Sequence, residues 1–258
     1  MLLIIDIGNT SMMFGVFHKD ELKEKFTIKS NKTITSDDLG VSITQYLALF
    51  NLDKNQLEAV VIASVVPQLT DTLETAVKDY LEIPSYIVGQ NINIDLDISK
   101  YKSQAGIDRL INVYGGIKKY GDSLIIIDIG TALTIDVADN MGAFIGGIIF
   151  PGIHSLNNAL SKDTAKLPIV DLKKPEHIIG NSTEECILRG VYYGYIYAID
   201  GMIEKIKAEL PYPATVIATG GYSSLLKDCK NIDIFDENLT LEGIRLIYEN
   251  RTIDSLED

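Results

Sequence analysis

The sequence is poor in residue types that mark several common kinds of protein. It has no tryptophan, three histidines and two cysteines, Cys186 and Cys229, in 258 residues. Two cysteines are too few for a disulfide framework or a structural zinc site, so we expect two buried free thiols in a reducing compartment. The three histidines are scattered along the chain without the spacing of metal ligands.

Basic residues are also scarce. The chain has 23 Lys and Arg against 36 Asp and Glu, a formal net charge of −13. Broad contact with nucleic acid or anionic lipid needs a basic face, so we expect neither partner. An anionic small ligand remains compatible with this charge, because a few backbone amides and one local cation can hold a phosphate in an acidic protein.

Long apolar runs are missing as well. The longest, residues 143–153, is interrupted by glycine and proline and is far shorter than the roughly 20 residues that span a bilayer. The start of the chain, residues 1–5, leads directly to Asp6 without a basic segment or a cleavage site, so no signal peptide is expected. With 46% hydrophobic and 23% charged residues, the composition predicts a soluble, cytoplasmic globular protein.

One segment of the chain occurs twice. Residues 2–10, LLIIDIGNT, return at 124–131 as LIIIDIGT, and Asp128 follows Asp6 by 122 residues. Each copy is an apolar run, an aspartate, a glycine turn and a second run, a pattern typical of a β-hairpin. Two copies about half a chain apart predict two similar α/β domains that face each other across a cleft. The predicted domains are residues 1–112 and 113–258.

Helical and strand patterns alternate along the rest of the chain. Helices are expected at residues 37–50, 68–82, 106–120, 153–161, 182–209 and 241–250. Strands are expected at residues 58–64, 85–88, 144–150 and 214–218, with a solvated strand edge at 23–26. The helix at 106–120 is placed to bridge the two halves. Four tyrosines within 182–209 are expected to serve the core or a dimer interface.

The two glycine turns have the chemistry of a phosphate site. Glycine lets the backbone approach an anion closely, and successive amides then point at it. Asn9, Thr10 and Thr131 add side-chain donors, while an aspartate at a strand end is an oxygen ligand suited to Mg²⁺. One such turn is more often a plain hairpin turn, but two matched copies favour a nucleotide whose phosphates are held from both sides.

Further glycine pairs extend this interpretation. Gly146-Gly147 opens a segment that ends at Pro151-Gly152, and Gly220-Gly221 follows an apolar strand pattern. A glycine pair after a strand lets a flat ring lie against the backbone, so an adenosine site is plausible. The chain has neither a P-loop motif nor a Gly-x-Gly-x-x-Gly after its first strand, which argues against a P-loop kinase and a Rossmann dehydrogenase.

The segment Gly106-Ile107-Asp108-Arg109 has residues suited to an acceptor site. Asp108 could orient and deprotonate a hydroxyl as a general base, and Arg109 could pair with an anionic group of the substrate. In the structural alternative, Asp108 only stabilises a helix N-terminus.

Taken together, these motifs resemble those of the type III pantothenate kinase family, which belongs to the sugar kinase, heat-shock chaperone and actin superfamily. The matching segments keep the family's order over nearly the whole chain. They are residues 6–10, 64–67, 106–109, 128–134, 146–152, 180–183, 199–201, 219–221 and 239–246.

The resemblance implies a fold, a reaction and an assembly. The fold is α/β, with two similar domains of the actin-like ATPase (ribonuclease H-like) type around a central cleft. The reaction is the ATP-dependent phosphorylation of the primary hydroxyl of pantothenate to 4′-phosphopantothenate, the first step of coenzyme A biosynthesis. The assembly is a homodimer in which the partner subunit completes the substrate site, and the family requires K⁺ or NH₄⁺.

The resemblance also implies roles for residues. Asp108 would be the catalytic proton acceptor, and Asp128 would bind the monovalent cation. Residues expected to bind ATP, with Asp6 on the Mg²⁺ side, are Asp6, Ile7, Gly8, Asn9, Thr10, Ser11, Met12, Met13 and Thr131. Residues expected to bind pantothenate are Tyr101, Gly106, Ile107, Asp108, Arg109 and Thr183. The segment 101–106 is shorter than in the family and lacks its Asn-Pro, which bears on the placement of Tyr101.

Two other functions stay open. The chain could be a kinase of the same superfamily with another acceptor, such as a sugar, or a non-catalytic nucleotide-binding regulator. The joint presence of Asp6, Asp108 and Asp128 speaks against a regulator, because a regulator needs no general base.

Overall fold

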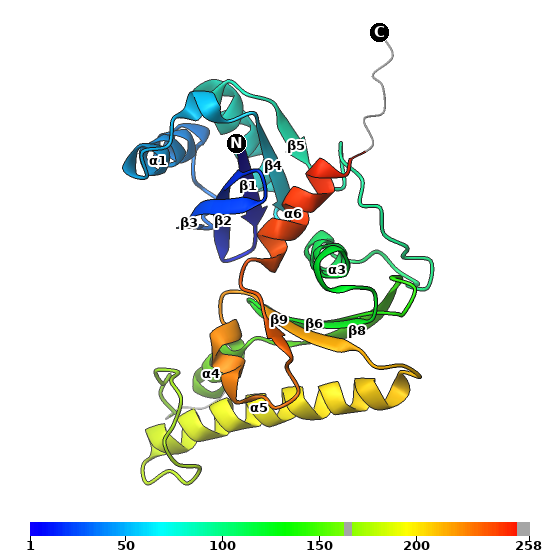
Figure 1. Cartoon of the computed structure of the whole chain (residues 1–258). Helices are drawn as coiled ribbons and strands as arrows, with labels where there is room; N and C mark the ends of the chain where they lie inside the picture. Colours follow the sequence, from blue (N-terminus) through cyan, green and yellow to red (C-terminus); the bar gives the residue numbers. More distant parts are fainter. Residues whose placement is uncertain (163–166, 252–258) are drawn as a thin grey trace. The chain divides into compact units, whose positions relative to one another are not determined.

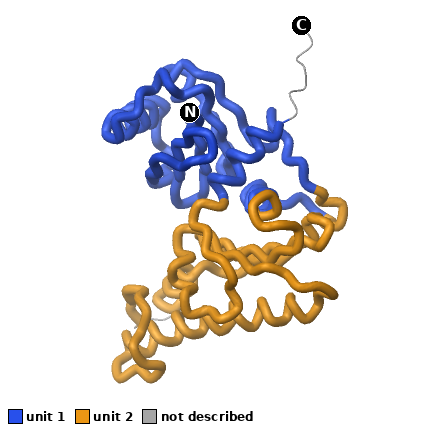
Figure 2. The backbone as a smooth tube through the Cα atoms, viewed as in Figure 1, with its two compact units in different colours: residues 1–96, 103–115, 240–258 blue, residues 97–102, 116–239 orange. Residues whose placement is uncertain are grey.

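The computed structural model describes residues 1–162 and 167–251. The chain divides into two compact units, shown in two colours in Figure 2. Unit 1 consists of residues 1–96, 103–115 and 240–258, and unit 2 consists of residues 97–102 and 116–239.

Unit 1 is built on a five-stranded mixed sheet with the order β3-β2-β1-β4-β5 (Figure 1). The central strand β1 pairs antiparallel with β2 and parallel with β4. The strands are β1 (Leu2–Ile7), β2 (Ser11–His18), β3 (Glu21–Lys29), β4 (Ala59–Ser64) and β5 (Ser85–Ile87). Because helices cover both faces, β1 is an almost continuous apolar run rather than an alternating one.

Each face of this sheet has its own core. Alternate residues of β1, among them Leu3 and Ile5, pack in one cluster with residues of α1 (Ser36–Leu49), α2 (Pro67–Ala76) and the π-helix η2 (Val77–Leu81). Leu2 and Ile4 point to the opposite face and pack with residues of α3 (Ile107–Tyr120) and α6 (Leu239–Glu249). A short 3₁₀-helix, η1 (Lys54–Gln56), precedes β4.

Unit 2 repeats the strand order of unit 1. Its five-stranded sheet has the order β8-β7-β6-β9-β10, in which β6 pairs antiparallel with β7 and parallel with β9. The strands are β6 (Leu124–Ile129), β7 (Ala132–Ala138), β8 (Phe144–Pro151), β9 (Thr215–Thr219) and β10 (Ile234–Phe235). The predicted fold class, two similar α/β domains of the actin-like type, is therefore confirmed. The short strand β10 lacks a sequence signal, because two residues show no periodicity.

A single long helix forms most of the core on one side of the second sheet. Helix α5 (Thr183–Glu209) packs its apolar residues against Ile125, Ile127 and other inward-facing residues of β6 and β7. Figure 1 shows this helix running along one side of the sheet. Unit 2 also contains α4 (Ile153–Lys162) and the 3₁₀-helix η3 (Ser223–Asp228). No helix in residues 1–162 and 167–251 combines the length and the apolar character needed to cross a membrane.

The compact units divide the chain differently from the predicted halves 1–112 and 113–258. Helix α6, at the end of the chain, belongs to unit 1 because Leu241, Ile244 and Ile247 are buried in the cluster that contains Leu2 and Ile4. Helix α3 contributes to both units, since the division falls between residues 115 and 116. The apolar stripe of α6 is evident from the sequence, but the sheet that this stripe covers is determined only by the tertiary structure.

Both cysteines are free thiols, as predicted, but the predicted burial is right for Cys229 and wrong for Cys186. Cys186 is exposed and Cys229 is buried. Burial raises the pKa of the Cys229 thiol to about 12, so this cysteine is an unreactive part of the core.

Candidate functional site

The predicted ATP-binding segment 6–13 forms one continuous strand, turn and strand in unit 1. Ile7 pairs with Met12, and the Gly8 backbone N–H donates to the Ser11 carbonyl at 3.0 Å. Ser30, directly after β3, holds the turn from outside, because its hydroxyl donates to the Gly8 carbonyl at 2.6 Å. The tip residues 9 and 10 are exposed. Since Ile7 and Met12 are core residues, only the backbone of these two positions is suited to contact a nucleotide.

Asp6 stands at the end of β1, half-buried. Its neighbours in the sheet are Met13 on β2 and Ala63 on β4. Both neighbouring side chains are apolar and offer no oxygen ligand. A cation at this position would therefore take its remaining oxygen ligands from water or phosphate, which is how Mg²⁺ is usually bound.

The second turn, between β6 and β7, is one residue shorter than the first. Ile129 pairs with Leu133, and the Gly130 backbone N–H donates to the Ala132 carbonyl at 3.0 Å. Thr131 is exposed at the tip. The start of α4 packs closely behind the turn, where a Cβ on Gly152 would lie 2.3 Å from the Thr131 carbonyl oxygen.

Asp128 occupies in β6 the position that Asp6 occupies in β1, and it too is half-buried. Its neighbours in the sheet are Thr134 on β7 and Thr219 on β9. Gly220 follows with φ = +89°, and a Cβ at this position would lie 2.3 Å from Asp128 Oδ1. Only glycine allows the backbone to lie against the carboxylate in this way.

The predicted acceptor segment forms the start of helix α3 in unit 1. Asp108 is half-buried in the first turn, and its Oδ1 accepts a hydrogen bond of 2.9 Å from the Arg109 backbone N–H. A Cβ on Gly106 would lie 2.5 Å from the same oxygen. The absence of a side chain at position 106 thus makes room for the carboxylate. Arg109 is buried, with 6% of its surface exposed.

Helix α3 lies on the same face of the first sheet as Asp6. Ile107 and Ile111 pack in the cluster that contains Leu2 and Ile4, and alternate residues of β1 place Asp6 on that same face. Behind the acceptor segment, Asn112 is buried and accepts a hydrogen bond of 2.8 Å from the Thr240 hydroxyl of α6. The structure thus brings Asp6 and the Asp108 helix together within unit 1.

The remaining predicted substrate residues, Tyr101 and Thr183, belong to unit 2. The Tyr101 ring packs against Phe144, with ring centres 5.0 Å apart, so this side chain is partly committed to the core. Thr183 is exposed in the first turn of α5.

The turn that contains Thr183 is fixed by a capping box. The Ser182 hydroxyl accepts from the Glu185 backbone N–H, and Glu185 Oε2 accepts from the Asn181 backbone N–H at 2.7 Å. The hydrogen bond from Asn181, followed by the attraction of Arg189, lowers the pKa of Glu185 below its ordinary value. The segment 180–183 singled out from the sequence is therefore a well-formed helix start.

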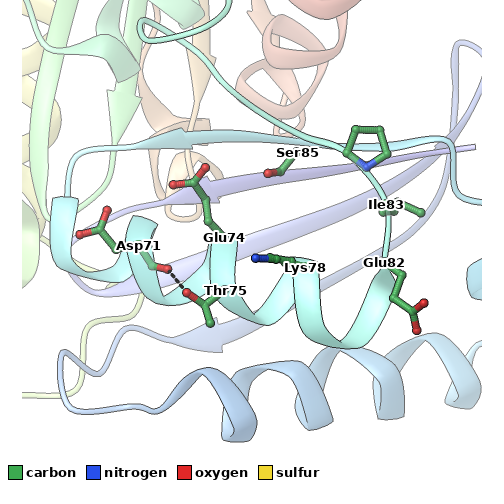
Figure 3. Close-up of a pocket in the computed structure, with 8 residues that line it drawn as sticks. Asp71, Glu74, Thr75, Lys78, Glu82, Ile83 and Ser85 are labelled. Atoms are coloured by element: carbon green, nitrogen blue, oxygen red, sulfur yellow. Dashed lines mark hydrogen bonds between the residues drawn. The ribbon is translucent and has the colours of Figure 1, made fainter.

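The structure also contains an open groove in unit 1 that none of the predicted site residues lines (Figure 3). Its residues are Asp71, Glu74, Thr75, Lys78, Glu82, Ile83, Pro84 and Ser85. The Thr75 hydroxyl is engaged with its own helix, since it donates to the Asp71 carbonyl at 3.0 Å. Three carboxylates against one ammonium make this groove unsuited to a polyphosphate.

No group of three or more His, Cys, Asp or Glu side chains that could hold a metal ion occurs among the described residues.

Two units with one strand order, each with an aspartate that leads into a glycine turn, define the chain as a two-domain protein of the actin-like class. Comparison with known proteins specifies the family. The family model for type III pantothenate kinase matches residues 2–205. The chain therefore belongs to the type III pantothenate kinase family, and it is a kinase.

Individual relatives agree with this assignment. The chain is 41% identical over 255 residues to the type III pantothenate kinase of Finegoldia magna, covering 96% of this chain and 97% of that protein. It is 38% identical over 252 residues to the type III pantothenate kinase of Geobacter sulfurreducens, covering 96% and 98%.

Among solved structures, a Campylobacter jejuni protein provisionally assigned as a Baf family transcriptional activator has a TM-score of 0.60 and 21% identity. The match covers 96% of this chain and 97% of that one. At this identity, the likeness concerns the fold alone.

Proposed function

We propose that this chain transfers the γ-phosphoryl group of ATP to the primary hydroxyl of pantothenate, with Asp108 as the proton acceptor. The observation that supports the proposal is the position of the Asp108 side chain. Its carboxylate stands in the first turn of α3 above Gly106, held by the Arg109 N–H, on a helix that packs on the sheet face of Asp6.

In this reaction the carboxylate mainly orients the alcohol. Phosphoryl transfer has a loose transition state, so the nucleophile needs little activation and its proton leaves late. Because one oxygen of Asp108 accepts the Arg109 N–H, the rotation of the carboxylate is restricted. Its other oxygen then accepts the alcohol proton as the oxygen–phosphorus bond forms and the bond to ADP breaks.

The two turns would hold the phosphates of ATP. Neither turn, 6–13 or 128–134, contains a lysine, so backbone N–H groups and bound cations must offset the charge of the triphosphate. Mg²⁺, when bound, would neutralise charge on the phosphates, and Asp6 is the residue suited to hold it. Asp128 is the residue suited to K⁺ or NH₄⁺.

Pantothenate carries a carboxylate that needs a cationic partner. Arg109 supplies a guanidinium directly after the proposed base, and its fork geometry matches a carboxylate. Tyr101 and Thr183 would complete the substrate site. A cleft between the two domains, lined by both sets of residues, stays a prediction.

We further infer that the chain is a homodimer that acts in the cytoplasm. A groove between β8 and α5, lined by Ile148, Tyr197 and Met202 among others, is mainly apolar, and Tyr197 is 62% exposed. A second copy is the favoured occupant, because two chains of charge −13 can meet stably only on a face of low charge. Light scattering on Tyr197→Glu tests this inference: a monomer is expected, and an unchanged dimer would contradict it.

The decisive test of the reaction is Asp108→Asn, which keeps the shape of the side chain. Loss of a general base is expected to lower turnover by about 10²- to 10⁴-fold, measured as pantothenate-dependent release of ADP. Binding of ATP, measured by calorimetry, is expected to persist. The control Asp71→Asn, in the acidic groove of Figure 3, is expected to turn over normally. Normal turnover by Asp108→Asn would remove Asp108 from the mechanism.

A panel of acceptors with labelled ATP separates the alternatives. Phosphorylation of pantothenate but of no sugar is expected. Transfer to a sugar in preference to pantothenate would identify another kinase of the superfamily, and ATP binding without transfer to any acceptor would identify a regulator.

A further inference from the structure

The two sheet neighbours of Asp128 are both threonines. Side chains that are directly opposite in adjacent strands lie on one face of the sheet, so Thr134 and Thr219 flank the carboxylate from either side. We propose that these two hydroxyls complete the monovalent-cation site at Asp128 and that buried Asp136 positions Thr134. This inference rests on the proposed function, in which Asp128 holds the cation.

The Thr219 hydroxyl is the observation that points to a ligand. Thr219 is fully buried, and its Oγ1 has no hydrogen-bond partner among the described residues. A buried hydroxyl without a partner is destabilising, and such groups are rare in folded proteins. A cation beside Asp128 would give this oxygen a partner and would account for a threonine where valine would pack equally well.

Thr134, on the strand at the other side of Asp128, is also oriented to bind a cation. Its hydroxyl donates to Asp136 Oδ2 at 3.0 Å, so its proton points along the strand to the buried carboxylate. The lone pairs of Oγ1 are then directed away from Asp136 and suit a cation. Asp136 is completely buried on β7, two residues further along the same face. It acts through Thr134 and is a positioning residue.

The sheet does not require these side chains. At the corresponding positions of unit 1, Asp6 is flanked by Met13 and Ala63, and the position that corresponds to Asp136 is Gly15, which pairs with Ile4 as Asp136 pairs with Ile126. The oxygen-rich row is thus specific to unit 2, although the strand order is the same.

The donor set favours a cation of low charge. One carboxylate and two neutral hydroxyls provide oxygen atoms without the additional negative charge that a protein cage for a divalent ion usually has. K⁺ is bound well by neutral oxygen dipoles in place of its water, and NH₄⁺ can donate hydrogen bonds to the same lone pairs.

The test measures cation binding without turnover. The melting temperature of the full chain is recorded in KCl and in NaCl at equal ionic strength, with a non-hydrolysable ATP analogue present and no pantothenate. The wild type is expected to be stabilised by K⁺ relative to Na⁺. An equal melting temperature in both salts would overturn the proposal.

Variants assign the effect to the hydroxyls. Thr219→Val and Thr134→Val are expected to raise the K⁺ concentration for half-maximal stabilisation by about 10- to 100-fold, whereas Thr219→Ser and Thr134→Ser keep the response. Thr215→Val is the matched control, because half-buried Thr215 lies on the same face of β9 but pairs with Leu124 and not with Asp128. In NaCl, Thr219→Val is expected to melt no lower than the wild type, because it removes an unpartnered hydroxyl. An unchanged K⁺ response in Thr219→Val would remove Thr219 from the site.

Asp136→Asn tests the positioning role. A raised half-maximal K⁺ concentration is expected, together with an altered ²⁰⁵Tl resonance when Tl⁺ replaces K⁺. An equal loss of stability in both salts, with an unaltered resonance, would show that Asp136 only supports the fold. These readouts do not use pantothenate, so a K⁺ response that depends on Thr219 would stand even if the proposed kinase reaction failed.

Discussion

The hairpins β1–β2 and β6–β7 are two versions of one backbone with different chemistry. Both place an aspartate at the end of the central strand, followed by a glycine whose N–H donates back across the turn. The side chains beside the aspartate differ: Met13 and Ala63 in unit 1, Thr134 and Thr219 in unit 2. In the proposed function, the repeated backbone would provide amides that suit phosphate, and the side chains on the neighbouring strands would decide which cation each aspartate holds.

The strongest test of this difference between the two hairpins is a matched pair of variants, Asp6→Asn and Asp128→Asn. If Asp6 holds Mg²⁺, its variant loses transition-state charge stabilisation worth several kcal/mol, so turnover is expected to fall about 100-fold or more in every monovalent salt. Asp128→Asn is expected to lose the preference for K⁺ over Na⁺ and to retain a normal dependence on Mg²⁺.

The measurement for this pair is ADP release with pantothenate, titrated with Mg²⁺ in KCl and in NaCl. The control is the wild type, titrated with Mg²⁺ in the same two salts. Identical cation profiles for the two variants would show that the two aspartates are not specialised.

A second difference between the two units lies one residue further along the parallel neighbouring strand. In each unit it is the residue directly after the one that pairs with the aspartate, that is, after Ala63 on β4 and after Thr219 on β9. It is Ser64 in unit 1 and Gly220, with φ = +89°, in unit 2. Gly220→Ala forces a Cβ into a left-handed backbone and against Asp128 Oδ1, so we expect the free energy of unfolding to fall by about 1–3 kcal/mol. Urea unfolding measures this change.

Gly221→Ala is the control for this prediction, because a Cβ at position 221 would meet nothing within 4 Å. It is expected to leave stability nearly unchanged. Equal stability of Gly220→Ala and the wild type would contradict the close approach of the backbone to Asp128.

The smallest expected effect concerns the outer turns of the two sheets. The turn between β2 and β3 is exposed, whereas that between β7 and β8 is organised by Asp139, which accepts from the N–H groups of Met141 and Ala143 and from the Lys100 ammonium. Burial alone would raise the pKa of Asp139, but the hydrogen bonds from Lys100 and the two N–H groups outweigh it and lower this pKa.

A lowered pKa gives stability that is present above the unfolded-state pKa of about 3.9 and is lost as the pH falls through the folded-state pKa. Asp139→Asn is expected to reduce stability at pH 7 by about 1 kcal/mol and to flatten its decline below pH of about 4. Urea unfolding between neutral and acid pH checks this, with Asp20→Asn in the exposed turn as control. A decline as steep as in the wild type would exclude Asp139 as a source of acid sensitivity.

Much of the fold follows from local patterns. The predicted helix at 182–209 matches α5 (Thr183–Glu209), and the predicted strand at 58–64 matches β4 (Ala59–Ser64), since each has a clear period and a capping or stop signal. The predicted helix at 68–82 is in fact α2 followed by the π-helix η2, because a period of 3.6 residues does not distinguish one wide turn from regular helix.

Only part of the candidate site could be predicted from such local patterns. The glycine turns and the segment 106–109 stand out as contiguous motifs, and counting back across the hairpin pairs Asp128 with Thr134. Thr219 lies 91 residues after Asp128, and no local period joins it to Asp128.

The sequence by itself determined the repeat, the two turns and the order of helices and strands, because these depend on neighbouring residues and on periods of two and 3.6. Only the tertiary structure decided that β9 lies parallel beside β6, which places Thr219 next to Asp128, and that α6 covers the first sheet rather than the second. Such pairings are made between segments far apart in the chain, and they are selected by the burial of whole apolar faces rather than by any local signal.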